Sequence, residues 1–188
     1  MLFCLSMVLL KSDMKKLKPG DAAPHFSLEN VDGKIVSPTQ FRGKVFVIVF
    51  MCNHCPYVKP KMDEIAALQR DYEKKGVVVI GINSNDPAHY PDDDFTHMQQ
   101  LAQAKGYKYY LVDETQDIGK AYGATCTPDP FVFDVSHKLV YHGRINNQME
   151  PTDKVTEHTM RIVLDKILKN EKVENWFVPS MGCSIKWR

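Results

Sequence analysis

Two cysteines separated by two residues are the feature of this 188-residue sequence that most directly suggests chemistry. Cys52 and Cys55 follow a run of β-branched and aromatic residues, and a helical pattern comes after them. Free backbone N–H groups and the dipole at a helix start stabilise a thiolate, lowering a cysteine pKa from about 8.5 toward neutrality. Cys52 is therefore the expected nucleophile. Cys55, one helical turn further on, can attack a mixed disulfide formed at Cys52, so the pair predicts reversible dithiol–disulfide exchange.

His54 lies between the two cysteines, where an imidazole can favour the Cys52 thiolate and make the couple more oxidising. Two other interpretations stay open. The pair could be half of a zinc site, completed by Cys126 and a remote histidine, or two buried structural thiols. The sequence has no second Cys-x-x-Cys, and the strand-to-helix position favours redox chemistry. We expect no metal and no organic cofactor.

The elements that position this pair follow from hydrophobic periodicity. Residues 45–50 and 77–82 are unbroken apolar runs, which predict strands buried on both faces of a partly parallel sheet. Between them, apolar residues recur from Val58 to Tyr72 at three- and four-residue intervals and predict a helix, with Lys61 among its water-facing residues. This order predicts a βαβ unit with a right-handed crossover.

Shorter elements complete the predicted domain. An Asp-Gly turn between residues 26–29 and 34–37 predicts an N-terminal hairpin. Helices are predicted over residues 93–105, 115–122 and 152–170, and a second hairpin over 131–134 and 138–142. His142 and Asn146, which come at the end of that hairpin, are expected on the polar surface.

Length and composition indicate one ordinary compact domain, because 44% of the residues are hydrophobic and 25% are charged. With 24 basic and 23 acidic side chains the formal charge is +1, so no overall field favours nucleic acid as a partner. Five unevenly placed cysteines argue against a disulfide scaffold. We predict an N-terminal extension at 1–17, the domain at 18–170, and a tail at 171–188 that packs on it.

The apolar start, residues 1–10, is preceded by no Lys or Arg and followed by no small-x-small cleavage site. Ten residues are also too few to span a bilayer. These features predict a soluble cytoplasmic protein with no membrane partner. If translation begins at Met7 or Met14, Cys4 lies outside the functional protein; otherwise the extension packs on the domain.

Three N-terminal motifs stand at characteristic spacing before the cysteine pair. They are Pro19-Gly20-Asp21-Ala22-Ala23-Pro24-His25-Phe26-Ser27-Leu28, Asp32-Gly33-Lys34 and Phe41-Arg42-Gly43-Lys44-Val45. In this combination, residues 18–169 resemble the thioredoxin-like redoxins, the branch of the thioredoxin superfamily that includes the AhpC/TSA proteins and thiol-disulfide oxidoreductases. The resemblance implies an α/β thioredoxin fold, with a central mixed β-sheet flanked by helices and an N-terminal β-hairpin extension. The tail motif around Cys183 also resembles uncharacterised redoxins.

The resemblance also implies site residues. Pro60 matches the proline that kinks the active-site helix, and Thr127-Pro128 matches the family's cis-proline, which lies against the cysteine pair. Asn53, Thr127 and Pro128 are thus expected to bind substrate. Cys126 and Cys183 are possible additional redox thiols; the alternatives are a small buried side chain at Cys126 and, at Cys183, a tail that stays away from the pair.

The sequence departs from the family pattern at three positions. Phe46 stands where thioredoxins place a buried carboxylate, and Val58 where the cytochrome-maturation thioredoxins place a glutamate. Val49 stands three residues before Cys52, where peroxiredoxins have a threonine. The usual proton acceptor for Cys55 and the usual peroxidase hydroxyl are therefore absent from their expected places.

Together these features predict a thiol-disulfide oxidoreductase that acts on protein or small-molecule disulfides, with an external thiol as electron donor. We expect a monomer or a weak dimer. One alternative is a peroxiredoxin-like thiol peroxidase with antioxidant activity, in which Cys52 passes through a sulfenic acid. The other is a non-catalytic thioredoxin-fold module that holds a metal with Cys52, Cys55 and a histidine.

Overall fold

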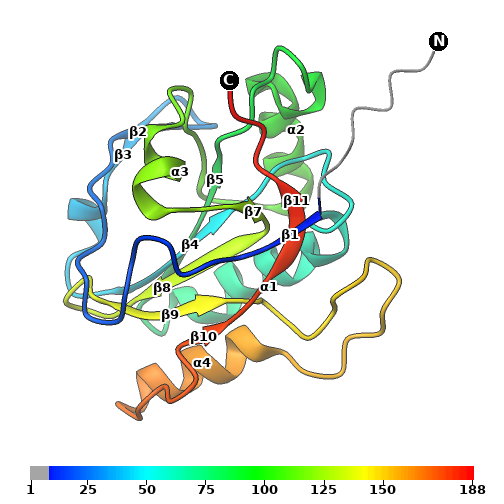
Figure 1. Ribbon diagram of the computed structural model, residues 1–188. Helices are drawn as coiled ribbons and strands as arrows, with labels where there is room; N and C mark the ends of the chain where they lie inside the picture. Colours follow the sequence, from blue (N-terminus) through cyan, green and yellow to red (C-terminus); the bar gives the residue numbers. More distant parts are fainter. Residues whose placement is uncertain (1–8) are drawn as a thin grey trace.

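The structure, a computed structural model, describes residues 9–188 (Figure 1). Residues 1–8, including Cys4 and the alternative start at Met7, lie outside the described residues. A central eight-stranded mixed sheet comprises, in spatial order, β10 (Phe177–Val178), β9 (Leu139–Gly143), β8 (Asp129–Phe133), β4 (Val45–Phe50), β5 (Val77–Asn83), β6 (Tyr110–Val112), β2 (Leu28–Asn30) and β3 (Ile35–Val36). A three-stranded sheet comprises β1 (Leu9–Lys11), β11 (Met181–Ser184) and β7 (Cys126–Thr127).

The predicted strands and hairpins at the centre of the chain are confirmed. β4 and β5 run parallel from Val45↔Val77 to Phe50↔Ile82, as expected for a βαβ unit. β8 pairs antiparallel with both β4 and β9, and β2 pairs antiparallel with β3. The strands that the sequence did not predict are β1, β6, β7, β10 and β11, all of two to four residues, too short to show a periodic pattern.

Alternating residues of β4 point to two different cores, because successive strand side chains face opposite sides of a sheet. Val45, Val47 and Val49 belong to a cluster with apolar residues of α1 (Met62–Glu73), α2 (Phe95–Lys105) and α4 (Thr159–Leu168). Phe46 and Phe50 pack on the other face, in a cluster that includes Tyr122 from α3 (Asp117–Tyr122). The central strand is therefore covered on both sides and ends in a buried environment.

The helix that follows the cysteine pair begins later than the sequence predicts. Residues 53–54 form a bend and residues 56–58 a turn, the 3-10 helix η2 (Lys59–Lys61) follows, and α1 begins only at Met62. Pro60 consequently stands at the start of this helical segment and not as a kink within a longer helix, because a residue without an N–H fits the first turn. The same early turn buries Lys61, which was wrongly expected to face water.

The other helices agree with prediction at one end or both. The 3-10 helix η3 (Pro91–Asp93) precedes α2, whose N-cap is Asp94 and whose last turn ends at Gly106 with a φ of 73°. α4 begins seven residues after the predicted Thr152. The preceding loop forms local hydrogen bonds instead: Gln148 Nε2 donates to the carbonyls of Pro151 and Asp153 at 3.1 and 2.9 Å. Such side-chain bonds compete with helix formation.

Both ends of the described chain meet at β7. In Figure 1, β1 (blue) and β11 (red) lie next to one another beside β7. β11 is the middle strand: it pairs antiparallel with β1 through Leu9↔Cys183 and with β7 through Cys183↔Thr127. The C-terminal residues therefore return to the segment that precedes Pro128.

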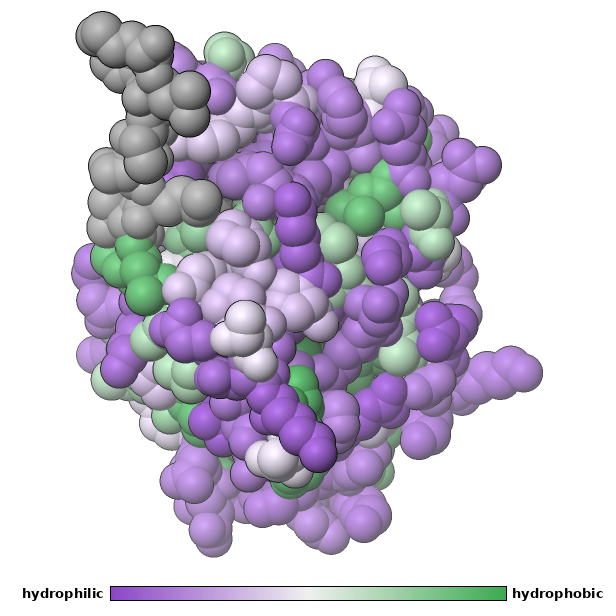
Figure 2. All heavy atoms as spheres, turned by 90° about the vertical axis from the view of Figure 1, so that its right-hand side faces the viewer, coloured by the Kyte–Doolittle hydropathy of each residue, from purple (hydrophilic) through white to green (hydrophobic). Residues whose placement is uncertain are grey.

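The face of the molecule seen in Figure 2 is mainly hydrophilic, with small, separated apolar patches. The helices of residues 9–188 include none with the length and apolar character needed to span a bilayer.

Candidate active site

The two cysteines lie directly beyond the end of β4, where the chain leaves the central sheet. Both are 0% exposed and belong to the same buried cluster as Val49 and Met51. They are unbridged in this structure. The pair is therefore shielded from solvent, which differs from the partly exposed position expected for a reactive thiolate.

The loop before Pro128 lies against both sulfur atoms. Cys52 Sγ is 3.5 Å from the Thr127 hydroxyl oxygen, and the Cys55 thiol donates to the Thr127 carbonyl at 3.2 Å. The Thr127–Pro128 peptide bond is cis, which confirms the prediction at Pro128. Asn53 points elsewhere: its side-chain oxygen accepts a hydrogen bond from the Tyr110 hydroxyl at 2.9 Å. The structure thus brings Cys52, Cys55 and Thr127 together.

His54 is held by an aspartate that the sequence analysis did not single out. Asp93 Oδ2 lies 2.5 Å from His54 Nδ1, and Asp93 Oδ1 accepts the backbone N–H groups of Asn53 (2.7 Å) and His54 (3.3 Å). Asn85 also donates to Asp93, at 2.8 Å, and the His54 ring stacks on Tyr90 with 4.6 Å between ring centroids. One fully buried carboxylate therefore fixes the Cys-x-x-Cys turn. The only signal for Asp93 in the sequence was an acidic run, and nothing in that run indicates which of its aspartates is buried.

The pKa directions at the cysteines differ from the prediction of a Cys52 thiolate. Burial, hydrogen bonding to Cys55 and the Asp93 carboxylate raise the pKa of Cys52. Hydrogen bonds from Cys183 and Cys52 lower the pKa of Cys55. The physical reason is that no helix starts at Cys52, so burial dominates there, whereas several donors converge on Cys55. Of the two cysteines, Cys55 is accordingly the one with the lower pKa.

Lys61 supplies a buried cation near Cys55. Its side chain is among the most buried in the protein, and Nζ donates to Gln148 Oε1 at 3.3 Å and to the Tyr57 carbonyl at 3.4 Å. Burial lowers the pKa of Lys61, while the charge on Cys55 acts in the opposite direction. Lys61 is thus placed to stabilise a Cys55 thiolate. Sequence reasoning missed it because the helical pattern assigned this position to the surface.

We expect Lys61→Gln to raise the pKa of Cys55, because it removes an opposite charge from a poorly solvated site. The measurement is the ultraviolet absorbance of the thiolate in reduced protein as a function of pH. Lys59→Gln is the matched control, since Lys59 is exposed two residues earlier. Equal titration curves for the two variants would show that Lys61 does not act on the thiolate.

A second buried histidine–aspartate hydrogen bond supports the cis-proline loop. His142 Nε2 lies 2.7 Å from Asp129 Oδ1, and the His142 ring stacks on Phe131 at 3.9 Å between centroids. Asp129 Oδ2 accepts the backbone N–H of Thr125 at 3.1 Å. The expectation of a surface position was therefore wrong for His142, and also for Asn146, which is buried and donates to Glu64. The fold brings Asp129 and His142 together from adjacent strands.

The two additional cysteines occupy different positions relative to the pair. The Cys126 thiol lies 3.8 Å from the Pro128 carbonyl, and burial raises its pKa. Cys183 lies in β11 opposite Thr127, and hydrogen bonding between Cys183 and Cys55 raises the pKa of Cys183 while lowering that of Cys55. The tail does return to the cysteine pair, which was the condition for a role of Cys183.

One group of residues has the donor types of a metal site. Ligand atoms of Cys52, His54 and Asp93 all lie within 4.8 Å of one another, and His54 Nε2 is buried without a hydrogen-bond partner. However, both Asp93 oxygens already accept hydrogen bonds from the turn and from Asn85. A metal would have to replace the bonds that hold the Cys-x-x-Cys turn, so these residues fit a hydrogen-bonded anchor better than a metal centre.

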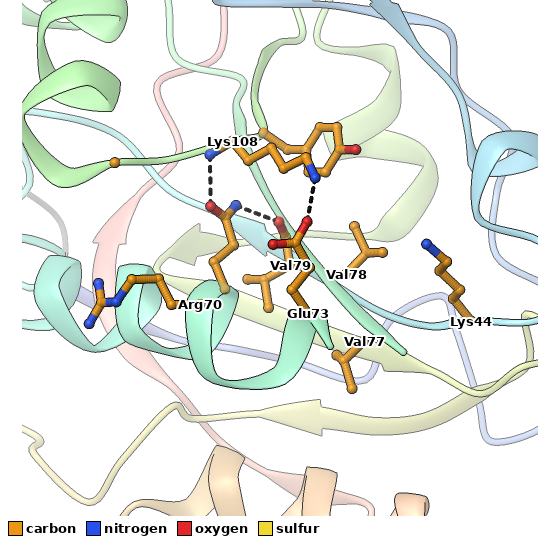
Figure 3. A pocket seen from close by; sticks show the side chains of 10 residues that line it. Lys44, Arg70, Glu73, Val77, Val78, Val79 and Lys108 are labelled. Carbon is orange, nitrogen blue, oxygen red and sulfur yellow. Dashed lines mark hydrogen bonds and ion pairs between the residues drawn. The ribbon is translucent and has the colours of Figure 1, made fainter. Parts of the chain in front are cut away.

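A well-formed pocket of about 100 Å³ lies at the other end of the sheet, around the start of β5 (Figure 3). Its polar groups bind one another: Gln69 accepts the backbone N–H of Lys108 and donates to the Val79 carbonyl, both at 2.7 Å, and Lys108 pairs with Glu73. Because Val77 pairs with the first residue of β4, this pocket is a full strand length from Cys52. It takes no part in the chemistry of the cysteines.

Comparison with known proteins places the chain among redoxins. It is 24% identical to the thiol-disulfide oxidoreductase ResA of Halalkalibacterium halodurans over 141 residues, 73% of this chain and 76% of that protein. It is 30% identical to a putative peroxiredoxin, bcp, of Helicobacter pylori over 112 residues, 59% of this chain and 69% of that protein.

Solved structures agree on the fold. An uncharacterised conserved protein of Geobacillus kaustophilus superposes with a TM-score of 0.91 at 42% identity, covering 98% of both chains. A thioredoxin-family thiol:disulfide interchange protein of Chlorobium tepidum superposes with a TM-score of 0.63 at 21% identity, covering 81% of this chain and 99% of that one. The similarity to the Chlorobium tepidum protein supports the predicted thioredoxin fold and nothing about activity. The model of the AhpC/TSA family matches residues 19–142, about two thirds of the sequence, and the chain belongs to this family.

Proposed function

We propose that this protein is a thiol-disulfide oxidoreductase whose redox couple is Cys52 and Cys55. The observation that carries the proposal is the convergence of both sulfur atoms on Thr127, the residue before cis-Pro128. Main-chain groups beside a cis-proline can pair with an extended segment of a disulfide partner, as the family resemblance implies. The substrate class is a protein or small-molecule disulfide, and an external thiol returns the couple to its reduced form.

In the first step Cys52 attacks one sulfur of the substrate disulfide. A thiolate is required, and the Cys52 thiol donates to Cys55, so transfer of that proton ionises Cys52 without changing the net charge of the site. A new bond forms between Cys52 Sγ and the substrate sulfur, and the other substrate sulfur leaves as a thiolate. His54, fixed by Asp93, is the proposed group that favours the Cys52 thiolate.

In the second step Cys55 passes the proton it received to the released substrate thiolate, and the resulting Cys55 thiolate attacks Cys52 Sγ in the mixed disulfide. The Cys52–Cys55 bond forms, and the substrate leaves with both sulfurs reduced. Lys61 stabilises the attacking charge on Cys55. Because both cysteines are covered in the described conformation, a bulky substrate must displace part of the covering segment before the first step.

The proposal is tested by turnover of two substrates with dithiothreitol as donor: insulin, whose reduced chains precipitate, and hydrogen peroxide. We expect insulin reduction above the rate with dithiothreitol alone, and peroxide consumption no faster than that of the Cys52→Ser variant. Rapid peroxide consumption without insulin reduction would contradict the proposal and support the thiol-peroxidase alternative. Stoichiometric metal in protein purified under reducing conditions would instead favour the metal-binding alternative.

A further inference from the structure

The C-terminal strand occupies the edge of the cis-proline loop. β11 pairs antiparallel with β7 through Cys183↔Thr127 and Ser184↔Cys126, directly before Pro128. Directly paired residues of antiparallel strands have Cα atoms about 4.5–5.5 Å apart. Thr127 is also the residue whose carbonyl accepts the Cys55 thiol at 3.2 Å. The same residue therefore contacts Cys55 on one side and is the strand partner of Cys183 on the other.

The contact between this strand and the loop is unusually close. A Cβ built on Gly182 would lie 1.8 Å from the Thr127 carbonyl oxygen, so only glycine permits this approach. Further bonds fix the tail on either side: the Ser180 hydroxyl donates to the Pro128 carbonyl at 2.6 Å, and the Lys186 backbone N–H donates to Asn85 at 2.8 Å. The tail is thus held in one register, and that register sets the position of Cys183.

Three sulfurs are consequently gathered in one buried cluster with Cys55 between the other two. Cys52, Cys55 and Cys183 belong to the same core cluster, and Cys55 interacts with both of the others. Thiol-disulfide exchange needs an attacking sulfur and a leaving sulfur on the two sides of a central one. Cys55 has the central position, with Cys52 and Cys183 as the possible leaving and attacking groups.

We propose that Cys183 is a third redox thiol, delivered by β11 as an internal exchange partner for Cys55. This inference rests on the proposed Cys52–Cys55 couple. In the oxidised protein, the Cys183 thiolate attacks Cys55 Sγ, the Cys55–Cys183 bond forms, and the Cys52–Cys55 bond breaks. Cys52 leaves as a thiolate and takes the proton that Cys183 lost. The number of disulfides stays at one, so the step needs no further oxidant.

The exchange has a structural consequence. The Cys55–Cys183 bond holds β11 covalently against the cis-proline loop, where an extended partner would pair. The exchange also returns Cys52 to the thiol form. The oxidised protein would therefore exist in two forms. In one, the disulfide joins Cys52 to Cys55 and the tail is not covalently bonded. In the other, the disulfide joins Cys183 of the tail to Cys55. External thiol must reduce the Cys55–Cys183 bond before the tail can leave.

Disulfide mapping tests the inference in the full-length chain. Reduced protein is oxidised with one equivalent of diamide, alkylated at acidic pH, digested without reduction and analysed by mass spectrometry. We expect two products, an internal Cys52–Cys55 disulfide and a cross-link that joins the Cys55 peptide to the Cys183 peptide. Cys183→Ser should lose the cross-link completely and keep the internal disulfide. Cys52→Ser should keep the cross-link and lose the internal disulfide.

A second pair of variants tests the strand without altering a cysteine. Gly182→Ala introduces a clash with Thr127, so we expect at least a tenfold lower yield of the Cys55–Cys183 cross-link with the Cys52–Cys55 disulfide retained. Ser184→Ala is the matched control, because alternation along the strand points this side chain away from the Cys183 face, and it should keep wild-type yields.

The outcomes separate the two proposals. A Cys52–Cys55 disulfide in the absence of any Cys55–Cys183 cross-link, in wild type and in Cys52→Ser, would overturn the internal exchange and leave the proposed function standing. A Cys183 linked only to Cys4 or Cys126 would overturn it as well. Absence of the Cys52–Cys55 disulfide from wild-type protein would contradict the proposed function itself.

Discussion

Cys52→Ser is expected to lower the rate of insulin reduction by about three orders of magnitude or more, because a serine hydroxyl is not ionised at neutral pH and cannot form a mixed disulfide. The structure gives the substitution little other effect, since a serine hydroxyl can keep the polar contacts that the Cys52 thiol makes with Thr127 and Cys55. The measurement is the initial rate with dithiothreitol as donor, corrected for the rate without protein.

Cys55→Ser should give a different phenotype from Cys52→Ser. If Cys52 attacks and Cys55 resolves, Cys55→Ser forms the mixed disulfide but cannot release it, so a covalent complex with the substrate accumulates. Non-reducing electrophoresis detects that complex. Cys4→Ser is the control, because it removes a cysteine that has no role in the proposed couple. If the covalent complex accumulates in Cys52→Ser instead, Cys55 is the attacking cysteine and Cys52 the resolving one. The lowered pKa of Cys55 makes this the outcome to compare against.

The second large effect is expected for the stability of the Cys-x-x-Cys turn. Asp93→Ala should lower the free energy of unfolding by about 3–5 kcal/mol, since it removes the buried partner of His54 and leaves two backbone N–H groups and the Asn85 amide without an acceptor. Urea denaturation of the reduced protein measures the change. The affected groups stand next to Cys52, so the variant should also lose most of its insulin-reductase activity.

Asp92→Ala provides a control of the same type one residue earlier. Asp92 is exposed, and surface substitutions of this kind change stability by about 0.5 kcal/mol or less. Equal unfolding free energies for Asp92→Ala and Asp93→Ala would show that the hydrogen bonds to Asp93 do not hold the turn, and the proposed role of His54 would lose its structural basis.

Local patterns in the sequence were enough to predict the centre of the fold. The predicted runs at residues 45–50 and 77–82 became adjacent parallel strands, because unbroken apolar segments can be buried on both faces only within a covered sheet. The Asp-Gly turn gave the N-terminal hairpin, and the resemblance at Thr127-Pro128 gave the cis peptide bond. Each of these properties is encoded within a few consecutive residues.

Helix boundaries near the site were predicted less well, for a common reason. The segments after Cys55 and before α4 carry helical spacing, but side chains there bond to backbone groups or to distant residues instead. Lys61 was assigned to water on its type and spacing, whereas the turn at Pro60 directs it toward Gln148 from a loop nearly ninety positions later in the chain. Periodicity reports one face of a helix and contains no information on such partners.

The sequence by itself determined that this chain has a central mixed sheet, a Cys-x-x-Cys at the end of a buried strand and a cis-proline to face it, because each depends on residues close together in the chain. Only the tertiary structure decided that Asp93 anchors His54, that Lys61 is buried near Cys55, and that the tail returns to set Cys183 against the same sulfur. These contacts join residues far apart in sequence, and they decide which of the two cysteines has the lower pKa. The electrostatics of the buried site therefore depend on the fold as a whole, not on the spacing of the motif.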